Sequence, residues 1–364
     1  MSKTQTAFHG SDLEKIEAIY GVKKEDVINF AANVNPYGIS TTLKEQLAQN
    51  LDVISSYPDR DYTLLRKSIG EYCNANPDHI VVGNGSTELI SIMAQFLEPQ
   101  SALILSPTYS EYSREVGLAG GQVCYFELKE KDEFSLDMDA LFKEMDKGYD
   151  MLIICNPNNP TSGALHHAEL KEIFEYAKKT NTFIVIDETY VEFARDYKDI
   201  TAVTLTGEYS NFIVLRGVSK FFAAPGIRLG YAITSNQELL DTIRKKQNPW
   251  TVNSLAEQAG ILMFKDEEYI RKTQELMWQE QDRMYDVFAA SKDYKPYKAN
   301  GNFILLKILN PELNATVLFE RCIRKGLMIR NCASFPYLDE SFIRFCFMKP
   351  EDNDKLVATL MGCN

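Results

Sequence analysis

The sequence predicts an α/β fold: a large domain built on a mostly parallel β-sheet with helices on both faces, plus a smaller α+β domain. From about residue 79, short apolar runs alternate with amphipathic stretches, as strands and helices alternate along a parallel sheet. After about residue 253 a long charged helical stretch leads into a new set of elements. With 364 residues and 45% hydrophobic content, the chain can form one large domain with an appendage or two domains.

The expected strands are short apolar runs bounded by turn-forming residues, and the expected helices repeat apolar residues every three or four positions. In the large domain the strands are HIVVGNG, ALILSP, MLIICNP, TFIVIDE, NFIVLRG and GYAIT, and the clearest helices are STELISIMAQFL and AELKEIFEYAKK. The long helix DEEYIRKTQELMWQEQDRMYDVFAAS should bridge the domains. It precedes the strands GNFILLKI and SFIRFCFM and the helices TVLFERCIRKG and EDNDKLVATLMG of the smaller unit.

Composition narrows the class of partner. The formal net charge of −12 disfavours nucleic acid and anionic membranes, because phosphate backbones require clustered Lys and Arg. Anionic small molecules remain open, since they need only a few local cations. Seven cysteines without CxxC spacing predict neither a disulfide framework nor a metal site, and no apolar stretch is as long as a membrane span. We therefore expect a cytoplasmic enzyme or binding protein.

Lys220 lies in the segment VLRGVSKFFAAPGIRLGYAIT, between two runs that predict buried strands. A surface lysine on a loop is the ordinary interpretation. A lysine held beside a core has a lowered pKa, however, and the resulting neutral amine is what Schiff-base chemistry with a carbonyl requires. The segment therefore makes Lys220 a candidate catalytic amine.

In VVGNGSTELI an expected strand runs through Gly83 and Gly85 into a helix that Ser86 and Thr87 open. Glycines allow close approach of an anion, and free N–H groups at a helix start bind phosphate. A plain N-cap by Ser86 or Thr87 is an equally good explanation.

TFIVIDETY places Asp187 at the end of an apolar strand, where open α/β sheets face their ligands. A carboxylate there needs a cation such as a protonated pyridine nitrogen, although capping of a following helix competes with this interpretation. Tyr190 could face the same crevice or belong to the core.

Two further segments follow expected strands. In IICNPNNPTSG, Asn158 and Asn159 offer amides within a turn. In SPTYSEY, Tyr109 could stack on a flat cofactor or pack in the core.

The ordered set GNGSTE, SPTYSEY, NPNNPT, DETY, SK and GIRLGY, spread over residues 30 to 346, resembles the fold type I pyridoxal-phosphate enzymes of the class I/II aminotransferase superfamily. The resemblance implies pyridoxal 5'-phosphate (PLP) as cofactor and a small domain assembled from both chain ends. It divides the chain into an N-terminal segment 1–40 that packs with the small domain, a PLP-binding domain 41–255, and a linking helix with the small domain over 256–364.

The resemblance also assigns roles. Lys220 would form the Schiff base and shuttle a proton, Asp187 would bind the pyridine nitrogen, and Tyr190 would contact the phenolic oxygen. The remaining implied cofactor contacts are Gly85, Ser86, Thr87, Tyr109, Asn159, Ser219 and Arg228, with Tyr57 of SSYPDRDY reaching the phosphate from the second subunit of a homodimer. One departure concerns the turn after NPT, where the superfamily commonly has Gly and this chain has Ser162.

Within the superfamily the chain is most similar to histidinol-phosphate aminotransferases and threonine-phosphate decarboxylases, with FHGSDLEKIEAIYG, SKFFAAPGIRLGY and MIRNCASFPYLDESFIRF leaning toward the decarboxylases. Arg344 resembles a residue that grips a substrate carboxylate, and Arg330 one that grips a distal phosphate. Salt bridges within the small domain are the alternative for both. Asn35 is a further candidate for substrate binding.

The two reactions share their catalytic residues and differ in how the substrate is held. Because transaminases dominate the superfamily, we expect an aminotransferase that acts on a small anionic amine, with an O-phospho amino acid decarboxylase as the alternative. 2-Aminoethylphosphonate is a third possible substrate. A catalytically silent binding module would lack the intact Lys220 and Asp187, and a nicotinamide-dependent dehydrogenase would carry a GxGxxG after an early strand.

Overall fold

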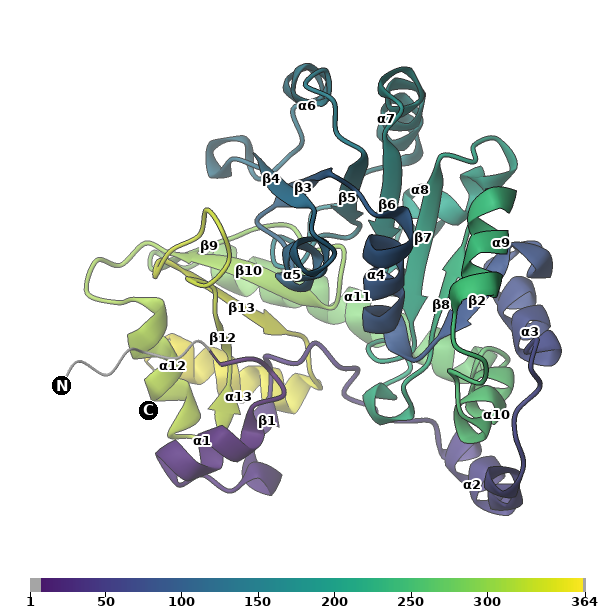
Figure 1. Ribbon diagram of the computed structural model, residues 1–364. Helices are drawn as coiled ribbons and strands as arrows, with labels where there is room; N and C mark the ends of the chain where they lie inside the picture. Colours follow the sequence, from purple (N-terminus) through teal and green to yellow (C-terminus); the bar gives the residue numbers. More distant parts are fainter. Residues whose placement is uncertain (1–7, 363–364) are drawn as a thin grey trace.

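The computed structural model describes residues 8–362, and its strands there form sheets of seven, four and two strands (Figure 1). The larger sheet has seven strands in the order β2-β8-β7-β6-β5-β3-β4. Every pairing among β3 to β7 is parallel, and β8 is antiparallel to both of its neighbours. The strands are β2 (Ile80–Gly83), β3 (Ser101–Ser106), β4 (Gln122–Glu127), β5 (Met151–Cys155), β6 (Phe183–Asp187), β7 (Phe212–Gly217) and β8 (Gly230–Ile233).

Helices cover both faces of this sheet, so successive residues of a strand enter different cores. In β5, Leu152 and Ile154 join the larger core, whereas Met151 and Ile153 join the smaller one. The smaller core is closed by α4 (Gly85–Leu97), α5 (Glu111–Leu118) and α9 (Gln237–Lys246), and the larger by α3 (Thr63–Cys73), α7 (His167–Thr180) and α10 (Ser254–Met263). Burial on both faces explains why the strand sequences are continuous apolar runs.

The small domain is a four-stranded antiparallel sheet in the order β12-β13-β10-β9, made of β9 (Tyr294–Pro296), β10 (Phe303–Ile308), β12 (Arg330–Asn331) and β13 (Phe342–Cys346). In Figure 1 it lies beside the N-terminal elements, because β1 (Ile28–Asn29) pairs with β11 (Leu327–Met328). The remaining helices are α1 (Leu13–Tyr20), α2 (Thr41–Gln49), α6 (Met138–Met145), α8 (Tyr197–Ile200), α11 (Glu267–Ala289), α12 (Ala315–Ile323) and α13 (Pro350–Leu360).

The predicted fold class is confirmed. The predicted charged stretch forms the long helix α11, and α10, which was not predicted, precedes it. The C-terminal strands β10 and β13 and the helices α12 and α13 lie where the sequence predicts them. In the large sheet, strand β4 was not predicted: it is one of the two edge strands, and its residues are exposed or half-buried, so it lacks a continuous apolar run. The first seven residues of the predicted segment 1–40, and Cys363, lie outside the described residues.

Two further observations concern residues 8–362. The six cysteines described are free thiols, and no group of three or more His, Cys, Asp or Glu side chains is arranged to hold a metal ion. No helix in this part of the chain has both the length and the apolar character that crossing a membrane requires.

A buried ion pair supports the end of β6. Arg216 of β7 and Glu188, the residue after β6, are both fully buried, with Nη2 and Oε2 2.7 Å apart. Thr201 donates from Oγ1 to the same carboxylate at 2.9 Å, and the backbone N–H of Ala202 donates to Oε1 at 2.6 Å. A buried pair of this kind is tolerated only when additional hydrogen bonds satisfy it, as they do here. The network fixes the backbone directly after Asp187.

Candidate active site

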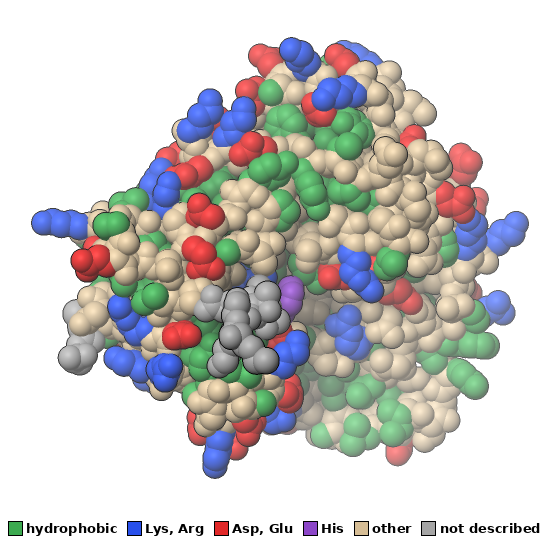
Figure 2. All heavy atoms as spheres, turned by 60° about the vertical axis from the view of Figure 1, so that its left-hand side comes forward, with side chains coloured by type: hydrophobic (Ala, Val, Ile, Leu, Met, Phe, Trp, Pro, Cys, Tyr) green, Lys and Arg blue, Asp and Glu red, His purple; other side chains and the backbone are tan. Residues whose placement is uncertain are grey.

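A cavity of about 860 Å³ opens at the carboxyl ends of the parallel strands, where the large and small domains meet. Figure 2 shows this side of the molecule hollowed between the two domains, with basic side chains near the edge. Its lining comes from the large domain, from the small-domain strands β12 and β13, and from the N-terminal segments 9–11 and 29–36. Such a position, outside the carboxyl ends of strands, is where open α/β sheets bind ligands.

Lys220 lies in the loop after β7 and faces this cavity, so it is not an ordinary surface lysine. Its Nζ donates a hydrogen bond of 2.6 Å to the backbone carbonyl of Ala32. Burial lowers the pKa of the amine to about 8, and the charge of Arg344 acts in the same direction. A substantial fraction of Lys220 is therefore a neutral nucleophile near physiological pH.

Asp187 ends β6 and is buried in the wall of the same cavity. Tyr112 donates from its hydroxyl to Oδ2 at 2.7 Å, and Thr189 donates its N–H and hydroxyl to Oδ1 at 2.9 and 2.5 Å. Burial raises the pKa of the carboxyl, and the hydrogen bonds from Thr189 and Tyr112 oppose that effect. The bond to the Thr189 N–H is a local turn contact; no regular α-helix follows Asp187 directly, so helix capping does not explain this residue.

The start of α4 forms a cradle for an anion. Helix α4 begins at Gly85, and its N-cap residue is Asn84, which makes no side-chain capping bond. Ser86 and Thr87 lie inside the first turn, so neither is the N-cap, and both line the cavity. Gly85 has φ +80°, and a Cβ on it would lie 2.2 Å from Nη2 of Arg228. Glycine is therefore required for the guanidinium to approach the helix start, where free N–H groups and a cation lie together.

Three other predicted cofactor residues, together with Ser219, lie in the cavity wall. Tyr190 accepts a hydrogen bond of 3.3 Å from Asn33, and its ring packs edge-on against Phe303. Asn159 accepts a hydrogen bond from Arg344 through Oδ1. Tyr109 packs against the smaller core and also lines the cavity, and burial raises its pKa to about 12.

The two predicted substrate arginines are cross-strand neighbours, because Arg330 of β12 pairs with Arg344 of β13. Both are buried and line the cavity. Arg330 donates to the carbonyl of Phe8 and to Ser334 Oγ, and burial together with the charge of Arg344 lowers its pKa to about 10. Arg344 donates to the carbonyl of Ala31, and its buried Nε has no partner among the described residues.

Neither arginine forms a salt bridge with any described residue, so the alternative of a small-domain ion pair is wrong for both. Lys220, Arg228, Arg330 and Arg344 face a cavity to which Asp187 contributes the one carboxylate among the described lining residues. Like charges directly opposite on neighbouring strands are unfavourable unless something compensates for them. The cavity is therefore a site for anionic groups.

The structure assigns other surroundings to three predicted residues. Asn35 lines the cavity, but its Nδ2 donates to the Phe221 carbonyl, Tyr269 and Thr273 at 2.8 to 2.9 Å, an arrangement that favours a scaffold role over substrate contact. The amide of Asn158 is bonded to Pro107 and Thr161 and lines a second cavity. Tyr57 is exposed, and its ring packs at a tilt of 38° against Trp250, outside the lining of this chain's own cavity.

Several lining residues were not predicted. Tyr112 follows Tyr109 by three residues, on the first turn of α5, and Thr189 follows Asp187 by two, a spacing typical of local turns. Those spacings could have suggested both. His9 and Asn33 reach the cavity from the far end of the chain, and no local pattern in the sequence indicates that they do.

The lysine and aspartate at the end of a mostly parallel sheet define a fold type I PLP-dependent enzyme, and comparison with known proteins names the family. The chain matches the family described as Aminotransferase class I and II over residues 25–360, and it belongs to that family. PLP is the cofactor of this family.

The relatives carry two different activities in their names. Over 352 residues the chain is 30% identical to the threonine-phosphate decarboxylase of Salmonella typhimurium. This match covers 97% of this chain and 95% of that protein. The crystal structure of histidinol-phosphate aminotransferase from Clostridium acetobutylicum is 31% identical, with a TM-score of 0.85, covering 92% of this chain and 98% of that one. A histidinol-phosphate aminotransferase from Sinorhizobium meliloti, in complex with PLP, shares the fold at 19% identity and a TM-score of 0.82, covering 100% of this chain and 99% of that one.

The residues present fit this cofactor. The cradle at the start of α4 suits a phosphate, and a Cβ on Gly85 would fill it. The buried Asp187 carboxylate suits a protonated ring nitrogen. The Lys220 amine, whose pKa is lowered, suits an aldehyde. The unpartnered Nε of Arg344 leaves a donor for a further anion.

The lowered pKa of Lys220 can be measured in cofactor-free protein. We expect labelling of Lys220 by an amine-selective reagent to increase as the pH rises through about 8, whereas a free lysine side chain requires about 10.4. The Arg344→Gln variant should shift the midpoint upward, because it removes a positive charge that disfavours the protonated amine. Peptide mass spectrometry across a pH series gives both midpoints, and a midpoint near 10 in the unmodified chain would contradict the account.

Proposed function

We propose that this chain is a PLP-dependent aminotransferase for a small amino compound that carries a phosphate, phosphonate or carboxylate. The observation that supports the proposal is the pair Arg330 and Arg344, which lie opposite each other on neighbouring strands and face the cavity without a carboxylate partner within residues 8–362. In histidinol phosphate and in 2-aminoethylphosphonate, the anionic group lies at a distance from the amine. A dicarboxylic amino acid as the second substrate would use the same guanidinium groups.

The chain's own side chains then have distinct tasks. When bound, PLP supplies a ring that withdraws electrons from the carbon attached to the substrate nitrogen. Asp187 holds a proton on the ring nitrogen, and its fixed hydrogen bonds keep the carboxylate in place. Lys220 Nζ, neutral for part of the time because of its lowered pKa, can accept and return one proton. Arg344 orients the substrate and, through Asn159, is tied to the cofactor side of the cavity.

A decarboxylase is the second candidate, and a specific observation favours it. The chain is 30% identical to the Salmonella typhimurium threonine-phosphate decarboxylase across nearly its full length. Decarboxylation uses the same lysine and aspartate and requires only that the carboxylate, instead of the hydrogen, be held for cleavage. An O-phospho amino acid would place one anion at each arginine.

Single-turnover reactions of the holo-protein separate the two candidates. Histidinol phosphate, 2-aminoethylphosphonate, glutamate, alanine and O-phosphothreonine would be added one at a time, with carbon dioxide and the chemical form of the cofactor measured together. We expect at least one phosphorylated or phosphonate amine to leave its amino group on the cofactor without gas release. Carbon dioxide from O-phosphothreonine, with the cofactor returned unchanged, would contradict transamination and identify the decarboxylase.

We further propose that the enzyme is a homodimer in a reducing cytoplasm. Tyr57 is 81% exposed and belongs to a group of exposed large apolar side chains on neighbouring segments, which also contains Leu51, Ile54 and Leu64. Exposed apolar patches of this kind mark interaction surfaces. In the proposed dimer a second copy covers these side chains, and Tyr57 reaches the partner's phosphate cradle. The free thiols suit a reducing compartment.

Mixed dimers test the shared site. Lys220→Ala and Tyr57→Ala should each have low activity alone. Random mixing of equal amounts should restore about one quarter of normal activity, because half of the dimers then contain one intact site. Activity is measured after refolding the mixture together and, as the control, after combining the folded variants without exchange. No recovery in the refolded mixture, although it is dimeric, would exclude a contribution of Tyr57 across the interface.

A further inference from the structure

Ser162 occupies a backbone conformation that L-residues rarely adopt. Its φ is +60°, and the residue is fully buried. Glycine adopts this region without a steric penalty, so a serine there needs a compensating interaction. The position is also the one at which this chain departs from the NPTG turn of its superfamily.

The compensating interaction comes from the small domain. Ser162 Oγ accepts hydrogen bonds from the backbone N–H groups of Asn300 at 3.1 Å and Gly301 at 2.8 Å. Asn300 also donates from Nδ2 to the Ser162 carbonyl at 3.1 Å. The backbone N–H of Asn300 also donates to the Ser162 carbonyl at 3.0 Å. A glycine at position 162 would therefore keep both bonds to the carbonyl and lose both contacts to the hydroxyl, which leaves the Gly301 N–H without this acceptor.

The segment bound by Ser162 leads directly to the substrate end of the site. Gln281 of α11 donates to the Gly301 carbonyl at 2.8 Å, which fixes the loop from behind. Two residues further along, the ring of Phe303 lies 5.3 Å from the Arg344 guanidinium and packs edge-on against Tyr190. The position of this loop therefore bears on two side chains of the candidate site.

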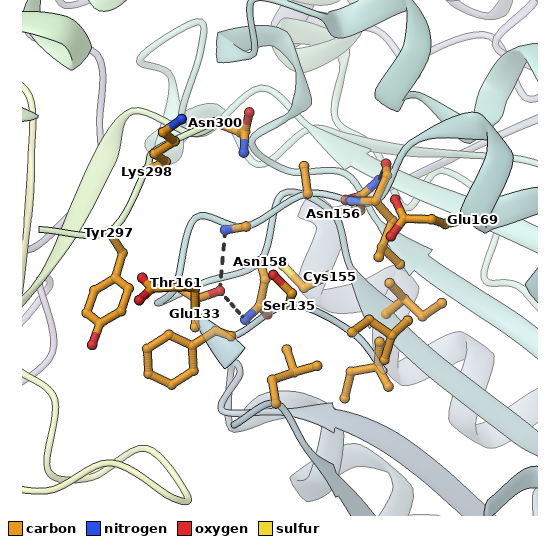
Figure 3. A pocket seen from close by; sticks show the side chains of 18 of the residues that line it. Glu133, Ser135, Cys155, Asn156, Asn158, Thr161, Glu169, Tyr297, Lys298 and Asn300 are labelled. Carbon is orange, nitrogen blue, oxygen red and sulfur yellow. Dashed lines mark hydrogen bonds between the residues drawn. The ribbon is translucent and has the colours of Figure 1, made fainter. Parts of the chain in front are cut away.

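The turn that carries Ser162 is buried and lies between two cavities. On one side Asn159 faces the cofactor cavity, and on the other lies a second cavity of about 380 Å³ (Figure 3). Figure 3 shows Asn158 and Thr161 on one wall of this second cavity, with Asn300 reaching it from the small domain. With a cavity on each side, the position of the turn depends strongly on its hydrogen bonds.

We propose that Ser162 is a positioning residue: it latches the turn that carries Asn159 to the small-domain loop that precedes Phe303, and so holds Arg344 in register with the cofactor. The part of this proposal that concerns Arg344 rests on the proposed function, in which Arg344 binds the substrate. Its mechanical part, the fixing of Gly301, stands on the hydrogen bonds themselves.

Two variants of the holoenzyme separate the latch from backbone strain. Ser162→Gly removes the hydroxyl and relieves the backbone strain. Ser162→Ala also removes the hydroxyl but leaves the backbone strain in place. Ser135→Ala, on another wall of the second cavity, is the matched control. In both Ser162 variants we expect the Gly301 amide to exchange hydrogen about tenfold faster, because its acceptor is lost, and the KM for the anionic substrate to rise by about tenfold with kcat less affected. The control should show neither change.

The outcomes are distinct. Unchanged exchange at Gly301 in Ser162→Gly would overturn the latch. Faster exchange with an unchanged KM would overturn its role in positioning Arg344. If none of the proposed substrates is turned over, the proposed function fails, and exchange at Gly301 still decides whether the latch exists.

Discussion

The constraint on which the site depends is an imbalance of charge among the side chains that face the cavity. Lys220, Arg228, Arg330 and Arg344 face one cavity that contains the single carboxylate of Asp187, in a chain whose net charge is −12. Charges taken out of water are costly unless they are paired and hydrogen-bonded. Anions that enter the cavity stabilise this arrangement, and a cofactor phosphate together with an anionic substrate would supply them.

Before those anions arrive, backbone carbonyls of the N-terminal segment partly solvate the cations. The carbonyls of Phe8, Ala31 and Ala32 accept hydrogen bonds from Arg330, Arg344 and Lys220, respectively. Parallel pairing of β1 with β11 holds the same segment against the small domain. The N-terminal segment is therefore part of the site, and its docking is coupled to the electrostatics of the cavity.

The sequence was sufficient to predict the fold class and to select residues most of which lie around one cavity, for an identifiable reason. Parallel strands buried on both faces are continuous apolar runs, and Asp187, Lys220 and the glycines of GNGSTE follow such runs directly. The edge strand β4 lacks that pattern and was missed. Contacts between distant segments, such as Asn33 with Tyr190 or Ser162 with Gly301, leave no local pattern in the sequence. For the same reason the sequence could not show that the Asn35 amide is bonded to Thr273 and not to a substrate.

The most direct test of the central claim is to locate the covalent link to the cofactor. The holo-protein would be reduced with borohydride, digested, and mapped by mass spectrometry for the pyridoxyl modification. The account predicts that the modification is confined to the peptide that contains Lys220. Modification of a different lysine, or none in protein that has bound PLP, would show that this charged cavity is not the catalytic site.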